Sequence, residues 1–160
     1  MSENKSIKVS TTRFGELDVN KEDVFFFPEG LLGFGPVKNY FILKRENQGP
    51  FEWLQAVDPP HLAFVICNPL LFKPDYRVKV KAEDLQSIKL DNLEDAVVYV
   101  ILVVPQEPKM MTANLQGPLV FNPKEKLAKQ LVLHGEEYTT RYRLFPDTQE
   151  SQPPAEAGGG

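Results

Sequence analysis

The 160-residue chain is 42% hydrophobic, which suffices for one domain with a packed core and excludes a chain that is disordered throughout. Its net charge of −4, without any cluster of Lys and Arg, disfavours direct nucleic-acid binding, because phosphate contacts need cations. The longest apolar run, 96–104, has nine residues, whereas a membrane helix needs about 20, so a soluble protein is expected. The single cysteine permits no internal disulfide, which favours the reducing cytoplasm.

The first half of the chain consists of short β-type segments separated by Gly and Pro. The strands predicted here are 7–19, divided into a hairpin at Gly15, then 24–27, 40–43, 51–57 and 62–67. The last of these is apolar on both alternating faces and is expected to be buried on both sides. Between the second and third, the nine residues 28–36 contain three Gly and two Pro, which indicates an irregular loop.

The second half adds further strands and the helix signals. Glu83 and Asp84 lie early in 82–88, as favoured in the first turn of a helix, and Asn92 is a candidate cap for one more turn. The strands predicted here are 76–81, with three cationic residues on one solvated face, then the fully apolar 97–104, 110–122 divided at Gly117, 127–134 and 139–145. About ten short strands, with turns roughly every 8 to 12 residues, predict an all-β fold: a small open β-barrel or roll with one or two short helices.

The composition changes after Phe145. The last residues, 147–160, are rich in Pro and Gly and contain three acidic residues, no Lys or Arg, and no apolar side chain larger than Ala. Such a segment cannot bury enough surface to offset the entropy lost on ordering. The sequence therefore predicts a β domain at 1–146 and a disordered acidic tail at 147–160.

Residues suited to catalysis or metal binding are few and isolated. His61 and His134 have no second ligand at metal-binding spacing, and Cys67 lies in an apolar strand, where a thiol is expected to be buried and unreactive. The glycines of 28–36 do not have the spacing of a dinucleotide-binding loop. We therefore expect no catalytic, cofactor or metal site and no enzyme activity. Two alternatives stay open: an enzyme with an unrecognised site, and a β-barrel that binds RNA directly.

Apolar side chains occur in the predicted loops, where they either close the end of a barrel or contact a partner. A loop constrained by Gly and Pro lowers the ordering cost of binding, and a charged neighbour suits the rim of an interface. The residues predicted to bind a partner are Glu29, Leu32 and Phe34, with Asp75, Tyr76, Met110 and Asn114 as a second group.

Several short motifs follow one another in a specific order between residues 7 and 145. They are Thr12-Arg13-Phe14-Gly15-Glu16, Phe27-Pro28-Glu29-Gly30-Leu31, Trp53-Leu54-Gln55, Phe72-Lys73-Pro74-Asp75-Tyr76, Met111-Thr112-Ala113-Asn114-Leu115, Asn122-Pro123 and Gln130-Leu131-Val132-Leu133. Each motif alone is weak, but the ordered set resembles the FliW family of flagellar assembly factors. Leu32, Gly35 and His61 depart from residues that are common in that family.

The resemblance implies a small cytoplasmic β-barrel without a cofactor, monomeric when free. It implies a protein that binds the translational regulator CsrA away from its RNA-binding surface and relieves its repression of flagellin translation. Flagellin is implied as the competing partner, and the protein itself is expected to bind neither nucleic acid nor membrane.

Overall fold

The computed structural model describes residues 5–45 and 49–145. Within these ranges lie eleven strands, one α-helix and four 3-10 helices, so the predicted all-β class is confirmed. The strands are β1 (Ser6–Thr11), β2 (Gly15–Asn20), β3 (Val24–Phe26), β4 (Asn39–Leu43), β5 (Glu52–Ala56), β6 (Ala63–Cys67), β7 (Val97–Val103), β8 (Thr112–Ala113), β9 (Leu119–Asn122), β10 (Leu127–Gln130) and β11 (Tyr142–Arg143). The helical elements are η1 (Lys21–Asp23), η2 (Pro69–Leu71), α1 (Ala82–Gln86), η3 (Leu93–Asp95) and η4 (Pro108–Met110).

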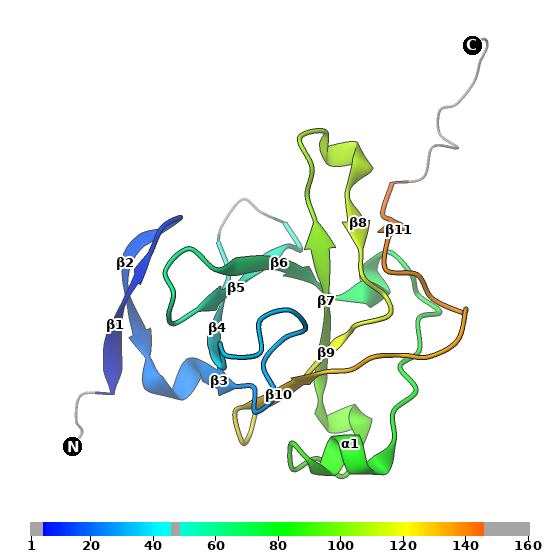
Figure 1. Cartoon of the computed structure of the whole chain (residues 1–160), viewed down its shortest axis with the longest axis horizontal. Coiled ribbons are helices and arrows are strands. Elements are labelled where there is room, and N and C mark those ends of the chain that lie inside the picture. The colour runs from blue at the N-terminus through cyan, green and yellow to red at the C-terminus, as the bar shows by residue number, and fades with distance from the viewer. Residues whose placement is uncertain (1–4, 46–48, 146–160) are drawn as a thin grey trace.

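Seven strands close into a ring. Neighbours pair in the order β7-β6-β5-β4-β3-β10-β9, and β9 pairs again with β7 (Figure 1). The pairings around the ring are antiparallel except that of β3 with β10. The C-terminal end of β7 pairs with β8, which pairs with β11, while β1 and β2 form a separate hairpin. The predicted small barrel or roll is confirmed, and the pairing of β7 with β9 closes it, where an open one was expected.

Aromatic side chains fill the ring. Phe27 and Tyr40 are fully buried, and Phe121 is 1% exposed. The Phe121 ring meets Phe25, Phe27 and Tyr99 edge to face, with ring centroids 4.9, 5.6 and 5.6 Å apart. Because alternate residues of a strand point to the same face, the strands that carry these rings direct them into one shared core.

The helix predicted at 82–88 is confirmed as α1, with its two acidic residues in the first turn. Leu85 of α1 and Ile88, just beyond it, pack against Val120 of β9 in a second cluster of buried residues. Asn122, at the end of β9, donates from Nδ2 to the Ile88 carbonyl at 2.8 Å. The short helix therefore covers the end of the sheet at which β9 terminates (Figure 1).

The segment 76–81 is not a strand, which corrects the sequence prediction. Its three cationic residues are exposed and its two valines half-buried, as the alternation predicted. No strand of the described residues pairs with it, and the Arg77 N–H donates instead to the Tyr138 hydroxyl at 2.9 Å. Alternation specifies which face is buried, whereas a strand also needs a neighbouring ladder, which a local pattern does not contain.

The apolar strand β6 is less buried than predicted, and the apolar strand β7 is exposed at both of its ends. In β6, Ile66 and Cys67 are buried, but the first three residues are only half-buried. In β7, Val97 and Val103 are 42% and 62% exposed. Closing a sheet into a barrel buries one face of each strand, and the other face meets solvent wherever no second layer covers it.

The predicted tail, 147–160, lies outside the described residues. Among residues 5–45 and 49–145, no helix is both long and apolar enough to span a membrane. The same residues contain no group of three or more His, Cys, Asp and Glu arranged to hold a metal ion, and His61 and His134 are both exposed.

Candidate partner-binding surface

The loop 28–36 joins β3 to β4 (Figure 1). One of its leucines, Leu31, packs in the barrel core. The backbone of the loop forms a tight turn in which the Phe34 N–H donates to the Leu31 carbonyl at 2.8 Å. The Lys38 ammonium donates to two carbonyls of the loop, at 2.9 and 3.1 Å. These bonds hold the loop in one conformation, so its exposed side chains are presented on an ordered backbone.

The three apolar residues of this loop divide between the core and the surface. Leu31 is 2% exposed and packs with the aromatic core, whereas Leu32 is 61% exposed. Phe34 is 38% exposed, and its ring rests edge to face on Phe64, with the centroids 5.3 Å apart. Leu31 therefore closes the barrel, and Leu32 faces solvent. The Phe34 ring contacts the barrel with one edge and is exposed at the other.

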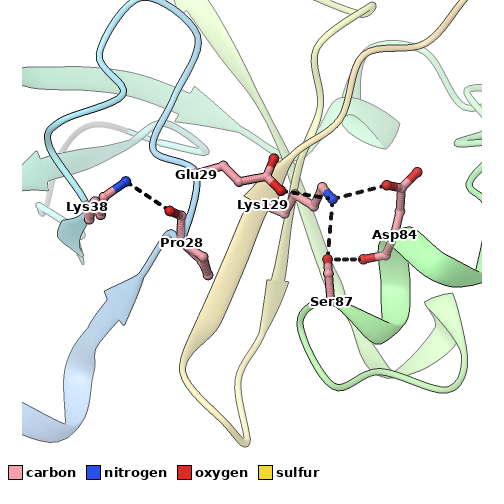
Figure 2. A network of polar contacts seen from close by, with 6 residues as sticks. All are labelled: Pro28, Glu29, Lys38, Asp84, Ser87 and Lys129. Atoms are coloured by element: carbon pink, nitrogen blue, oxygen red, sulfur yellow. Dashed lines mark hydrogen bonds and ion pairs between the residues drawn. The ribbon is translucent and has the colours of Figure 1, made fainter.

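Glu29 belongs to a polar network centred on Lys129 of β10 (Figure 2). The Lys129 ammonium lies 3.0 Å from Asp84 Oδ1, 3.3 Å from Ser87 Oγ and 3.6 Å from Glu29 Oε2. The Lys129 side chain is 15% exposed, while that of Glu29 is 69% exposed. The short contacts tie β10 to α1, and the longer one leaves Glu29 largely in solvent, where it is accessible to a partner.

A second polar link joins the loop to the predicted group around Asn114. The Leu32 N–H donates to Gln130 Oε1 at 2.9 Å, and Gln130 Nε2 donates to the Gly117 carbonyl at 3.0 Å. Asn114 Oδ1 in turn accepts the N–H groups of Gln116 and Gly117, both at 3.0 Å. The structure thus connects Leu32 and Asn114, which are far apart in the sequence, through Gln130.

The other predicted residues lie elsewhere. Asp75 is exposed, and a hydrogen bond from Lys73 at 3.1 Å lowers the pKa of its carboxyl group. Tyr76 is 6% exposed and donates its hydroxyl proton to the Leu115 carbonyl at 2.6 Å, and burial raises the pKa of that hydroxyl. Met110 is 40% exposed at the end of η4. In this conformation Tyr76 is a core residue, and its ring is not accessible to a partner.

Sequence reasoning did not identify Lys129 and Gln130 as residues that position the loop. One signal was present: two polar residues follow each other in a strand between Ala128 and Leu131, which are both buried. Polar side chains beside such apolar neighbours are half-buried and need hydrogen-bond partners. Which segments supply those partners depends on the pairing of β10 with β3, and that pairing is non-local.

Gly30→Ala is expected to displace the loop, whereas Gly33→Ala serves as a matched control. Both glycines have positive φ, +67° and +85°, but a Cβ on Gly30 would lie 2.5 Å from the Gly35 carbonyl oxygen, while one on Gly33 meets nothing within 4 Å. We expect Gly30→Ala to lower the free energy of unfolding by about 2–4 kcal/mol and Gly33→Ala by about 1–2 kcal/mol, the strain of a left-handed residue alone. Urea denaturation measures both, and equal losses would contradict the predicted close approach.

Cys67 is confirmed as buried, at 1% exposed, and burial raises the pKa of its thiol to about 11. The thiol of an unfolded chain has a pKa of about 8.5. Between about pH 8.5 and pH 11 the unfolded state therefore loses a proton that the folded state keeps, so the free energy of unfolding should fall as pH rises through this range. We expect a thiol reagent at pH 8 to label the native protein slowly and the urea-unfolded chain rapidly. Rapid labelling of the native protein would show that Cys67 is accessible.

Comparisons with known proteins identify relatives along nearly the whole chain. A family model described as FliW protein matches residues 8–144. The flagellar assembly factor FliW of Geotalea uraniireducens is 42% identical over 146 residues, which cover 91% of this chain and 89% of that protein. The protein of the same name from Alkaliphilus metalliredigens is 42% identical over 145 residues, covering 90% of each chain. A crystal structure described as the flagellar assembly factor FliW superposes with a TM-score of 0.82 at 34% identity, covering 88% of this chain and 98% of that one.

Proposed function

The chain belongs to the FliW family of flagellar assembly factors, and from this premise we propose that it is a cytoplasmic protein that binds the translational regulator CsrA. By binding CsrA away from its RNA-binding surface, the protein weakens the binding of CsrA to flagellin messenger RNA and relieves repression. Flagellin competes for the same protein, so flagellin that accumulates in the cell sets CsrA free to repress again. The protein acts by binding and not by catalysis.

The loop 28–36 supports this proposal. It presents Leu32 and the outer edge of Phe34 on a hydrogen-bonded backbone, beside the exposed carboxylate of Glu29. Apolar anchors with a charged neighbour match the centre and rim of a protein–protein interface. Because the loop is already ordered, little conformational entropy is lost when it binds.

A calorimetric titration of this protein with CsrA from the same bacterium tests the proposal. We expect saturable binding, and we expect addition of the protein to a CsrA–RNA complex to lower the amount of RNA bound even when RNA is in excess. Purified flagellin monomer should then displace the protein from CsrA. The absence of any CsrA binding would overturn the proposal.

RNA alone provides the control for the alternative of direct RNA binding. The net charge is −4, so we expect the protein without CsrA to bind flagellin messenger RNA weakly or not at all at moderate salt. Tight binding that weakens steeply as salt is raised would favour a barrel that binds RNA directly. Sedimentation of the free protein should give the mass of a monomer.

A further inference from the structure

A groove of about 730 Å³ lies beside the N-terminal half of β7, on the far side of that strand from β9. Its lining consists of Asn68, Pro69, Leu70, Tyr76, Arg77, Val78, Lys79, Leu93, Ala96, Val97 and Val98. Apolar side chains dominate, and two of them are well exposed: Leu70 at 52% and Val97 at 42%. The segment 76–79 and the start of β7 both contribute to this lining, together with residues of η2 and η3.

The β7 wall of this groove is an unpaired strand edge. The β6–β7 ladder ends at Cys67 opposite Val100, so among the described residues β9 is the only strand that pairs with β7 from Val97 to Tyr99. The 3-10 helix η2 also contacts β7, but it forms no ladder with that strand. The backbone of Ile101 faces the edge of β7 that β8 and β9 occupy, because its carbonyl accepts from the Asn114 N–H. Successive residues of a strand direct their N–H and C=O groups to opposite edges, and Val98 is three residues before Ile101. The N–H and C=O of Val98 therefore point away from β9, toward the groove. An unpaired edge of this kind is a template for one further strand.

The charges at the groove have one sign. Among its lining residues, Arg77 and Lys79 are the charged ones, and both are exposed. Lys79 lies 3.7 Å from Glu137 in an exposed ion pair, and pairs of this kind are weak. The two cations therefore remain available to an acidic group of a partner. Because the other lining residues are mostly apolar, a partner that fits this groove should carry both acidic and apolar side chains.

We propose that this groove binds an extended segment of a partner protein in which apolar and acidic residues alternate. The segment adds as a strand to the edge of β7 through the backbone of Val98. Its apolar side chains contact Leu70 and Val97, and its acidic side chains lie near Arg77 and Lys79. Strand addition supplies affinity through backbone hydrogen bonds, while the groove selects the side chains. This inference rests on the proposed function, because the peptides that test it are taken from CsrA and flagellin, the partners proposed above.

Overlapping 15-residue peptides that cover CsrA and flagellin, titrated against the full chain by fluorescence polarisation, test the proposal. We expect at least one peptide with alternating acidic and apolar residues to bind. The double charge reversal of Arg77→Glu with Lys79→Glu should weaken this binding at least tenfold. The matched control, Lys21→Glu with Lys124→Glu, reverses two exposed cations outside the groove and should leave it unchanged.

Two further measurements separate strand addition from simple charge attraction. N-methylation of alternate backbone amides in the bound peptide should abolish binding in one register and be tolerated in the other, because only one edge of an added strand faces β7. Leu70→Ser should also weaken binding at least fivefold, while Val103→Thr, an exposed site on β7 outside the groove, should not. Peptide binding that tolerates both N-methylation registers would overturn the strand geometry.

The outcomes distinguish this inference from the proposed function. If intact CsrA binds the protein but no peptide does, or if the groove variants bind the peptide normally, the groove proposal is wrong and the proposed function stands. If neither the intact partners nor their peptides bind, both are wrong.

Discussion

Phe34→Ala is expected to bind CsrA about 30-fold more weakly than the unaltered protein, a loss of about 2 kcal/mol in binding free energy. The Phe34 ring is 38% exposed, and its inner edge rests on Phe64 at 5.3 Å between centroids. That contact fixes the orientation of the ring before a partner arrives, so the outer edge is a preorganised anchor. Calorimetric titration of both proteins with CsrA measures the difference directly.

The stability of the same variant separates an anchor from a residue that only closes the core. Because the ring is partly exposed, we expect truncation to lower the free energy of unfolding by about 1–2 kcal/mol, less than the 3–5 kcal/mol typical of a buried Phe. Val103→Ala, at an exposed valine outside the loop, is the matched control and should change neither quantity. If Phe34→Ala is stable and binds CsrA fully, both roles are excluded, and the proposed surface moves to Asp75 and the stretch 110–114.

Phe121→Ala is expected to lower the free energy of unfolding by about 3–5 kcal/mol, the largest loss of stability that we predict. Phe121 is 1% exposed, and its ring contacts three other aromatic rings with centroids within 5.6 Å. Truncation removes these contacts and leaves a cavity at the centre of the ring of strands. Since β9 pairs with both β10 and β7, loosening its core face also weakens the closure of the barrel.

Phe26→Ala is the matched control for this loss. Phe26 lies on β3, also in the barrel wall, but its side chain is 41% exposed, so truncation should reduce stability by about 1 kcal/mol or less. Urea denaturation of the two variants gives the comparison. Similar losses for both would show that stability does not depend on the aromatic centre as the structure indicates.

The sequence by itself determined the properties that depend on neighbouring residues. The break at Gly15 placed a hairpin where β1 and β2 form, and the early acidic residues of 82–88 placed α1. Gly and Pro in 28–36 predicted an irregular loop, because these residues impose backbone conformations whatever surrounds them. The apolar neighbours of Cys67 also predicted its burial, and the ordered motifs identified the family.

Tertiary structure alone decided what depends on residues distant in the sequence. The segment 76–81 alternates as a strand does, yet it has no ladder partner among the described residues, whereas β7 finds partners on both edges and closes the ring. In the same way, Leu31 packs into the core while Leu32, its neighbour in the same loop, faces solvent. A local sequence pattern indicates only which backbone conformation its residues favour. Pairing and burial depend on which distant segments occupy the space beside it, and long-range packing energies decide that.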